Sequence, residues 1–423
     1  MTVSKSPFEK EGDLNSSEGM LSPYRVLDLA DEKGLICGKL LGDLGADVIK
    51  VERPGGDAAR CLGPFFHDEP HPEKSLFWLA YNTSKRGITL NIESSDGQAI
   101  FKRLVKTADV VVESFAPGHL GKLGLGYADL QKINPGIILV SISAFGQSGP
   151  YKDYKAPDIV AWAMGGNMAP FGEIDRPPIR IGYHSQAYLN AGADAAAGAL
   201  LGIFSGEGQH IDVSVQEAVV NCTEHITSRW DLMKFLQNRV DGPGTPGLRV
   251  TRIWPCKDGF ISWFYWEGVM SLTTNLPLVK WIESEGMADE FITQFDWSKF
   301  GPETPRDAID RIEAPTAKFF LSHTKAELFE GAIHRNVQVY PVSTAADILA
   351  DPQLTSRKFW TEVEHPELGT SLPYPGAFAA ASEAPPRITR RAPLIGEHNS
   401  EIFEADLGFS HEQILMLKQA GVI

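Results

Sequence analysis

The sequence predicts an α/β fold: a Rossmann-like large domain with a mostly parallel sheet, plus a smaller α+β domain. The 423 residues exceed the usual size of one hydrophobic core, which favours two domains. In the first half, short apolar strands alternate with amphipathic helices over short connections, a pattern typical of right-handed crossovers and parallel pairing. From about residue 259 the apolar segments become more aromatic, which indicates a second core.

Apolar periodicity marks the elements of the large domain. The expected strands lie at residues 24–29, 47–52, 109–113, 137–142 and 210–215. Helices are expected where apolar residues share one face, at 34–45 and 98–107, and at 191–199, which is almost entirely alanine and glycine. The chain ends in a helix that begins with a Ser410–Gln413 capping box and stops at Gly421.

These elements suggest a domain organisation along the chain. We expect a flexible lead-in at 1–23, the first part of the large domain at 24–205, a linker at 206–235, a small domain at 236–335, and a return to the large domain with a C-terminal helix at 336–423.

Composition excludes several classes of function. The net charge of −15 argues against a nucleic-acid partner or an anionic membrane surface. No run of about 18 apolar residues and no signal-peptide pattern is present, so we expect neither a membrane partner nor secretion. The four cysteines form no CxxC pair and suggest reduced thiols in the cytoplasm. The eleven histidines show no metal-ligand spacing, so no metal site is expected.

A glycine series follows the first expected strand at Gly34, Gly38, Gly42 and Gly45. Its spacing differs from the dinucleotide fingerprint, so a nicotinamide cofactor is not expected, and packing of a helix on the sheet explains the small residues. The longer string at residues 41–57, LGDLGADVIKVERPGGD, is far more specific than the glycines alone.

That string resembles CoA-transferase family III, the group of formyl-CoA and carnitine CoA-transferases. Similar family motifs stand at 82–86 (NTSKR), 113–118 (ESFAPG), 143–150 (SAFGQSGP) and 392–398 (APLIGEH), so the resemblance runs from about residue 24 towards the C-terminus. It implies an interlocked dimer that acts on coenzyme A or acyl-CoA as substrate, without a covalently bound cofactor.

The family places a nucleophilic aspartate just ahead of the small-residue helix, and this chain has none there. Residues 176–193 contain no carboxylate. Counting back from Gly192 places Tyr188 at the aspartate position, and counting forward from Gly182 places Ala187 there. We therefore expect no catalytic residue, with Tyr188 in the place of the aspartate.

The chemistry shows why this loss matters. In the family, the aspartate attacks the acyl-CoA thioester to form a mixed anhydride, the CoA thiolate returns to give an aspartyl-CoA thioester, and the incoming acid collects CoA. A tyrosine cannot pass CoA on in this way. Asp175 and Asp194 are the alternatives for a displaced active carboxylate, although Asp194 sits about two turns into the helix.

The implied CoA site also departs from the family pattern. The residues at family contact positions are Arg53, Ser114, Phe115, Lys122 and Lys155. Solvated surface charges and a core aromatic are the alternative explanation for these residues. Glu93 stands where the family has a phosphate-contacting lysine, and Ser114 replaces an asparagine. We therefore expect a degenerate CoA site in which Glu93 is unfavourable.

The resemblance implies a non-catalytic subunit of a heteromeric family member, whose partner is a catalytic paralogue carrying the aspartate. Such an enzyme would move CoA from an acyl-CoA, with succinyl-CoA favoured, to a free carboxylic acid such as benzylsuccinate in anaerobic aromatic (toluene) degradation. Two alternatives stay open: an active homodimeric CoA-transferase or acyl-CoA isomerase that uses a displaced carboxylate, and a non-enzymatic CoA or acyl-CoA binding protein. Dependence on a partner separates the first hypothesis from the other two.

Two segments of the expected small domain bear on assembly. An aromatic cluster is a candidate for a permanent subunit interface, or else for the core of the small domain: Trp254, Trp263, Phe264, Tyr265 and Trp266. The segment at 242–247 resembles the glycine-rich flap over the family's active site, which in a heterodimer would close over the aspartate of the partner.

Overall fold

The chain forms two compact units. The computed structural model describes residues 19–172, 176–182, 185–236 and 248–423. Within these, the first unit comprises the chain up to Met168, Arg180–Glu224 and Ser356–Ile423, and the second comprises Ala169–Ile179 and His225–Thr355. The segment at 206–235, which the sequence suggests as a linker, contains a strand of the main sheet and two helices.

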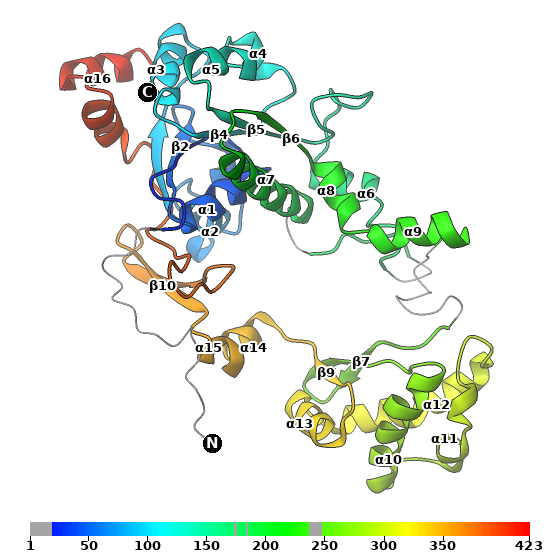
Figure 1. Ribbon diagram of the computed structural model, residues 1–423. Coiled ribbons are helices and arrows are strands. Elements are labelled where there is room, and N and C mark those ends of the chain that lie inside the picture. Colours follow the sequence, from blue (N-terminus) through cyan, green and yellow to red (C-terminus); the bar gives the residue numbers. More distant parts are fainter. Residues whose placement is uncertain (1–18, 173–175, 183–184, 237–247) are drawn as a thin grey trace. The chain divides into compact units, whose positions relative to one another are not determined.

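The first unit is built on a six-stranded parallel sheet (Figure 1). Its strands are β1 (Arg25–Asp28), β2 (Asp47–Glu52), β3 (Lys85–Thr89), β4 (Val110–Glu113), β5 (Ile138–Ser143) and β6 (His210–Ser214). They lie in the order β3-β2-β1-β4-β5-β6, the doubly wound arrangement of Rossmann folds. In register, Val26 lies between Val48 of β2 and Val110 of β4. This confirms the predicted α/β class; β3 is the strand that the apolar pattern does not mark.

Helices flank and extend this sheet. Those of the first unit are α1 (Leu35–Asp43), α2 (Leu76–Tyr81), α3 (Ser95–Val105), α4 (His119–Lys122), α5 (Tyr127–Ile133), α6 (Asp158–Met164), α7 (Gln186–Ser205), α8 (Val215–Asn221) and α16 (His411–Gln419). The remaining helices are α9 (Glu224–Met233), α10 (Leu276–Ser284), α11 (Glu290–Gln294), α12 (Arg306–Ser322), α13 (Lys325–Arg335), α14 (Ala345–Leu349) and α15 (Pro352–Ser356). Short 3-10 or π-helical turns lie at Ala58–Cys61, Phe66–Asp68, Ser271–Asn275, Trp297–Lys299 and Glu401–Asp406.

The sheet has an apolar layer on each face. Helices α1 and α7 cover one face and α3 and α5 the other (Figure 1). Alternating residues of each strand serve the two layers, so Val140 packs towards α7 and Leu139 towards α5. The C-terminal segment joins the second layer, where Phe403 and Ile423 are buried. The chain rejoins the first unit over Ser356–Ile423, whereas residues up to Thr355 belong to the second unit.

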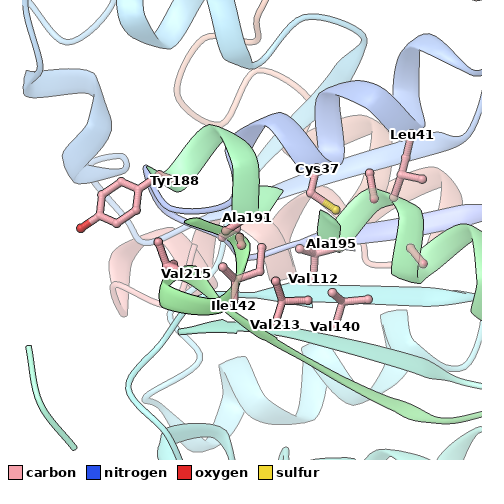
Figure 2. Packing of buried hydrophobic residues seen from close by; sticks show 14 of the residues in the cluster. Cys37, Leu41, Val112, Val140, Ile142, Tyr188, Ala191, Ala195, Val213 and Val215 are labelled. Atoms are coloured by element: carbon pink, nitrogen blue, oxygen red, sulfur yellow. The ribbon is translucent and has the colours of Figure 1, made fainter. Parts of the chain in front are cut away.

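Helix α7 lies close to its neighbours because its contact face is nearly free of side chains. A Cβ on Gly192 would come within 2.4 Å of Ile36, and a Cβ on Gly202 within 3.0 Å of Ile138. Ala191 and Ala195 pack against aliphatic side chains of the sheet (Figure 2). By length and composition α7 could cross a membrane, but its buried face belongs to the core of the first unit.

The C-terminal segment protects the edge strand β3. The backbone N–H of Thr89 donates to Oδ1 of Asn399 at 2.9 Å, and the N–H of His398 donates to the carbonyl of Gly87, also at 2.9 Å. These contacts satisfy backbone groups that an open edge would expose to pairing with another chain.

The second unit has its own core. It contains an antiparallel sheet of β7 (Ile253–Cys256), β8 (Gly259–Ser262) and β9 (Tyr340–Pro341). A separate hairpin, β10 (Trp360–His365) with β11 (Thr370–Pro375), belongs to the first unit. Trp254, Trp263 and Tyr265 are at most 2% exposed in the core of the second unit. The suggestion that these three aromatics form a subunit interface is therefore wrong, because their own domain already buries them.

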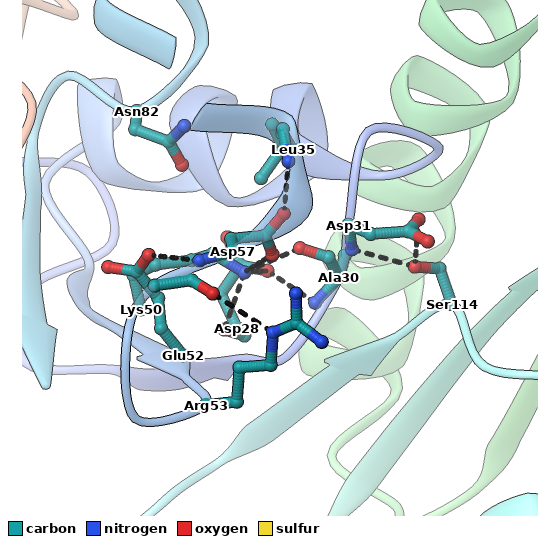
Figure 3. A network of polar contacts seen from close by, with 12 residues as sticks. Asp28, Ala30, Asp31, Leu35, Lys50, Glu52, Arg53, Asp57, Asn82 and Ser114 are labelled. Atoms are coloured by element: carbon teal, nitrogen blue, oxygen red, sulfur yellow. Dashed lines mark hydrogen bonds and ion pairs between the residues drawn. The ribbon is translucent and has the colours of Figure 1, made fainter. Parts of the chain in front are cut away.

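A buried ionic network ties Asp28, at the end of β1, to Lys50 in the middle of β2 and to Lys85 at the start of β3. Figure 3 shows the part of it around Asp28 and Lys50. Nζ of Lys85 lies 2.7 Å from Oδ2 of Asp28 and donates to the carbonyl of Leu35 at 2.7 Å and to Oδ1 of Asn82 at 2.9 Å. Nζ of Lys50 donates to the carbonyl of Ala30 and lies 4.0 Å from Oδ1 of Asp28. The side chains of Asp28, Lys50 and Lys85 are fully buried, so each charge depends on its partners.

Replacing one member of this network should be costly. We expect Lys85→Met to destabilise the protein by about 3–5 kcal/mol, because Asp28 is left buried without its closest cation. The double variant Asp28→Asn/Lys85→Met should lose less than the sum of the two single variants. Urea unfolding measures both, with Lys106→Met, an exposed lysine on the same unit, as control. Equal losses for Lys85→Met and Lys106→Met would contradict the assigned role of the network.

Candidate functional site

The topology itself indicates where a ligand would bind. The strand order reverses between β1 and β4, and ligands of open α/β sheets bind beyond the carboxyl ends of the strands at such a switch point. The loops that follow these two strands are residues 29–34 and 114–118. The predicted residues Ser114 and Phe115 lie in the second loop.

A side chain from each loop joins the two loops at this switch point. The backbone N–H of Asp31 donates to Oγ of Ser114 at 2.8 Å, and that hydroxyl donates to Oδ1 of Asp31 at 2.7 Å (Figure 3). Ser114 is 4% exposed. Its hydroxyl is thus already engaged within the chain, and the same carboxylate is held from the other side by Lys33.

Glu113 ends β4 beneath the second loop and carries a strongly shifted carboxyl group. Its Oε2 accepts the backbone N–H of Phe115 at 2.7 Å. Burial raises the pKa of Glu113 to about 7, while hydrogen bonds from Ser141 and Phe115 oppose the shift. Oγ of Ser141 also lies 2.9 Å from Nε2 of His210. A carboxyl, a hydroxyl and an imidazole therefore follow one another below the ligand-binding edge of the sheet.

Tyr188 lies in the first turn of α7 and is 5% exposed. Its hydroxyl donates to the carbonyl of Ala156 at 3.0 Å, and its ring points away from the aliphatic residues that α7 packs on the sheet (Figure 2). The backbone N–H groups of Ala187 and Tyr188 donate to Oδ1 of Asp158 at 2.8 and 3.2 Å. The donors that would surround a nucleophile at either counted position are therefore occupied by an internal carboxylate.

Carboxylates surround the Tyr188 phenol. Burial raises its pKa, and the charges of Glu32, Asp158 and Asp31 raise it further. The pKa of Glu32 is raised as well, by burial first and by Asp31 next. Sequence reasoning did not identify Glu32 and Asp31 as site residues; the signal was available, since both follow β1 at the switch point.

Of the two carboxylates considered as displaced nucleophiles, only Asp194 lies within the described residues. Asp194 is exposed on α7. It lies six residues beyond Tyr188, which is about 9 Å along the helix axis and about 120° around it. Asp175 and the flap-like segment 242–247 lie outside the described residues. Asp194 therefore does not share the position of the Tyr188 side chain.

The cations expected to contact CoA are all exposed. Arg53 follows β2 and donates from Nε to the carbonyl of Gly56 at 3.2 Å. Lys122 ends α4, and Lys155 precedes Ala156, the residue that accepts the Tyr188 hydroxyl. Lys155 is thus the chain neighbour of a residue that contacts Tyr188. Across the described ranges, no group of three or more His, Cys, Asp or Glu residues is placed to hold a metal ion.

The carboxylate of Glu93 lies at ion-pair distance from His119 of the same chain. Its Oε1 lies 3.0 Å from Nε2 of His119, and the His119 ring lies 4.8 Å from the ring of Phe115. The unfavourable charge predicted at Glu93 is therefore paired with the first residue of α4, directly after the loop that carries two predicted CoA contacts.

At Tyr188, the position predicted for the family aspartate, the arrangement offers a phenol and no carboxylate. A buried phenol with a raised pKa stays neutral near pH 7, and its hydroxyl is committed to a backbone carbonyl. The surrounding carboxylates are individually engaged: Asp31 with Ser114, and Asp158 with the start of α7.

Comparisons with known proteins agree with this fold. The sequence pattern of CoA-transferase family III matches residues 21–399. Succinyl-CoA:(R)-benzylsuccinate CoA-transferase subunit BbsE of Thauera aromatica is 35% identical over 95% of this chain and 98% of its own. Succinyl-CoA–D-citramalate CoA-transferase of Chloroflexus aurantiacus is 34% identical with the same coverage. A CAIB/BAIF family protein from Brucella suis superposes with a TM-score of 0.79 at 27% identity, over 92% of this chain and all of that chain.

The pKa of Glu113 predicts a pH-dependent stability. Because folding raises this pKa from 4.5 to about 7, the stabilisation is fully present below pH 4.5 and is lost as the pH rises through 7. Between pH 5 and 8 we expect the wild type to lose about 3 kcal/mol of unfolding free energy relative to Glu113→Gln. Urea unfolding of both proteins across this range measures the difference. Parallel curves would contradict the assignment, and Glu412→Gln on the exposed face of α16 is the control.

Proposed function

Because the chain belongs to CoA-transferase family III, we propose that it is the non-catalytic subunit of a heteromeric CoA-transferase. The observation that carries this proposal is Tyr188, a buried neutral side chain where the family needs a carboxylate nucleophile. Two relatives support a heteromeric assembly by their names: subunit BbsE of Thauera aromatica, and the succinyl-CoA–L-malate CoA-transferase beta subunit of Chloroflexus aurantiacus, 30% identical over 95% of this chain.

The reaction of the complex would move CoA between two acids. Succinyl-CoA is the donor that the names of these relatives have in common, which supports it as the donor here. The acceptor is a free carboxylic acid, with benzylsuccinate as the first candidate, which would place the protein in anaerobic aromatic degradation in the cytoplasm. The described part of the chain has only free cysteines, which fits a reducing compartment.

The chemistry would take place on the aspartate of the paralogue. That carboxylate attacks the thioester carbonyl of succinyl-CoA, the C–S bond breaks, and the CoA thiolate leaves a mixed anhydride. The thiolate then attacks the aspartyl carbonyl and releases succinate. The acceptor carboxylate repeats the two steps in reverse, so that CoA ends on the acceptor and the aspartate is regenerated.

The role of this chain would then be structural and indirect. In an interlocked dimer each chain depends on the other for its fold, so loss of one nucleophile does not make that subunit dispensable. Helix α7 leaves Phe204 91% exposed and Leu201 68% exposed, and such apolar exposure supports a protein partner in this region. The alternatives of an active homodimer and of a binding protein without turnover are outcomes of the tests that follow.

Activity should require the partner. We expect the isolated chain to transfer no CoA and to form no adduct that hydroxylamine or borohydride traps from succinyl-CoA, because Tyr188 cannot form the anhydride. Co-expression with the paralogue should yield a soluble one-to-one complex. Its activity should disappear when the paralogue's aspartate is replaced by alanine. A trapped adduct on Asp194, Glu32 or Asp158 would instead support a displaced carboxylate, and a stable, active homodimer would refute the proposal.

Restoring the aspartate alone should fail. In Tyr188→Asp the new carboxyl group would be buried among Glu32, Asp31 and Asp158, which raises its pKa and keeps it protonated. The nearby N–H donors already bind Asp158. We expect turnover by the isolated variant to stay at least about 10³-fold below that of the complex. Tyr188→Phe, which loses only the hydrogen bond to Ala156, serves as the control for folding and assembly; robust turnover by Tyr188→Asp alone would show an intact site.

A further inference from the structure

We propose that Glu93 closes this subunit's own CoA site, by occupying on His119 the place that a phosphate group of CoA would take. The inference rests on the proposed function and adds to it a defined contact that blocks the ligand. It concerns the loop after β4, which belongs to the switch point of the sheet where ligands of this architecture bind.

The pair brings together segments that are distant in the sheet. Glu93 follows β3, whereas His119 follows β4, and β2 and β1 lie between these strands. Oε1 of Glu93 nevertheless reaches within 3.0 Å of Nε2 of His119. The carboxylate thus crosses the ligand-binding edge of the sheet to meet the loop that carries Ser114 and Phe115.

His119 is positioned but poorly satisfied. Its ring is held at 4.8 Å from the Phe115 ring, and its Nε2 atom is shielded from solvent. Nε2 has no well-aligned hydrogen-bond partner among the described residues, so the Glu93 carboxylate faces it at ion-pair distance without ideal geometry. A shielded polar atom in this state costs free energy, and a phosphate oxygen in better alignment would recover it.

Charge explains why CoA does not simply add to the pair. Glu93 is 59% exposed and carries the same sign as a phosphate, so an incoming phosphate must displace it from His119. The same loop is tied down at its other end, where Ser114 bonds Asp31 and Phe115 bonds Glu113. The loop is therefore held without ligand, and Glu93 is the most exposed of the three carboxylates in these contacts.

The test measures how many CoA molecules bind the one-to-one complex with the paralogue. Calorimetric titration with CoA should give one site per complex for the wild type and two for Glu93→Gln. The full chain alone should bind CoA at least about fivefold more tightly as Glu93→Gln than as wild type. Glu412→Gln makes the same charge change on α16 and should leave both results unchanged.

Further arms identify the contact. Pantetheine, which has no phosphate, should show no gain from Glu93→Gln, and dephospho-CoA shows whether the 3′-phosphate or the diphosphate is involved. Adding His119→Ala to Glu93→Gln should remove the gain, whereas a purely long-range charge effect would keep it and overturn the proposal. Equal stoichiometry for wild type and Glu93→Gln would also overturn it. Either of these outcomes would overturn the proposal about Glu93 but not the proposed function. The proposed function would be overturned by a different observation, the absence of any complex with the paralogue.

Discussion

The buried carboxylate of Asp28 is the constraint on which the site depends. It ends the central strand β1 and contacts Lys50 of β2 and Lys85 at the start of β3, so one anion links these three strands. Lys85 also binds the Leu35 carbonyl at the start of α1, which sets where that helix begins. The helix can approach β1 this closely because residue 38 is glycine. A Cβ at this position would lie 2.2 Å from the Asp28 carboxylate. Desolvated charges of this kind are tolerated when the geometry of every partner is held.

The ionic network fixes the loop after β1, and this loop in turn positions the loop after β4. Lys50 holds the Ala30 carbonyl, and the next residue, Asp31, binds Ser114 across the switch point. Glu32 then comes close enough to Tyr188 to raise the pKa of its phenol. A single ionic cluster thus orders the first loop, and through it the second loop and the environment of α7.

The sequence predicts most strands of the main sheet, and the elements that it does not predict have physical explanations. Apolar runs identify β4 and β5, and Val48, Ile49 and Val51 identify β2, because parallel strands are buried on both faces. Strand β3 escapes that pattern because it begins with Lys85 and Arg86, whose charges are satisfied by the ionic network and by Asp47. Aromatic clustering after residue 250 identifies a core but cannot say whether a domain or an interface buries it.

The features of the candidate site also separate into those that the sequence predicts and those that it does not. The missing aspartate follows from residue identity and spacing, which need no coordinates. The contacts of Ser114, Glu93 and Tyr188 could not be predicted, because each partner is distant in the sequence: Asp31, His119 and Ala156. Contacts between residues that are distant in the sequence depend on how the loops converge at the edge of the sheet. Composition and local pattern do not predict that arrangement.

The acidic character of the site is itself informative. A site that binds an anionic thioester needs cations and free N–H donors where the phosphate groups of the ligand lie. Here carboxylates take the donors: Asp158 at α7, Asp31 at Ser114, and Glu93 at His119. Each is stabilised by a contact within the chain, so none depends on ligand. Loops whose polar groups are satisfied within the chain are held in place without a ligand, which fits the role that we propose, a subunit that completes a catalytic partner.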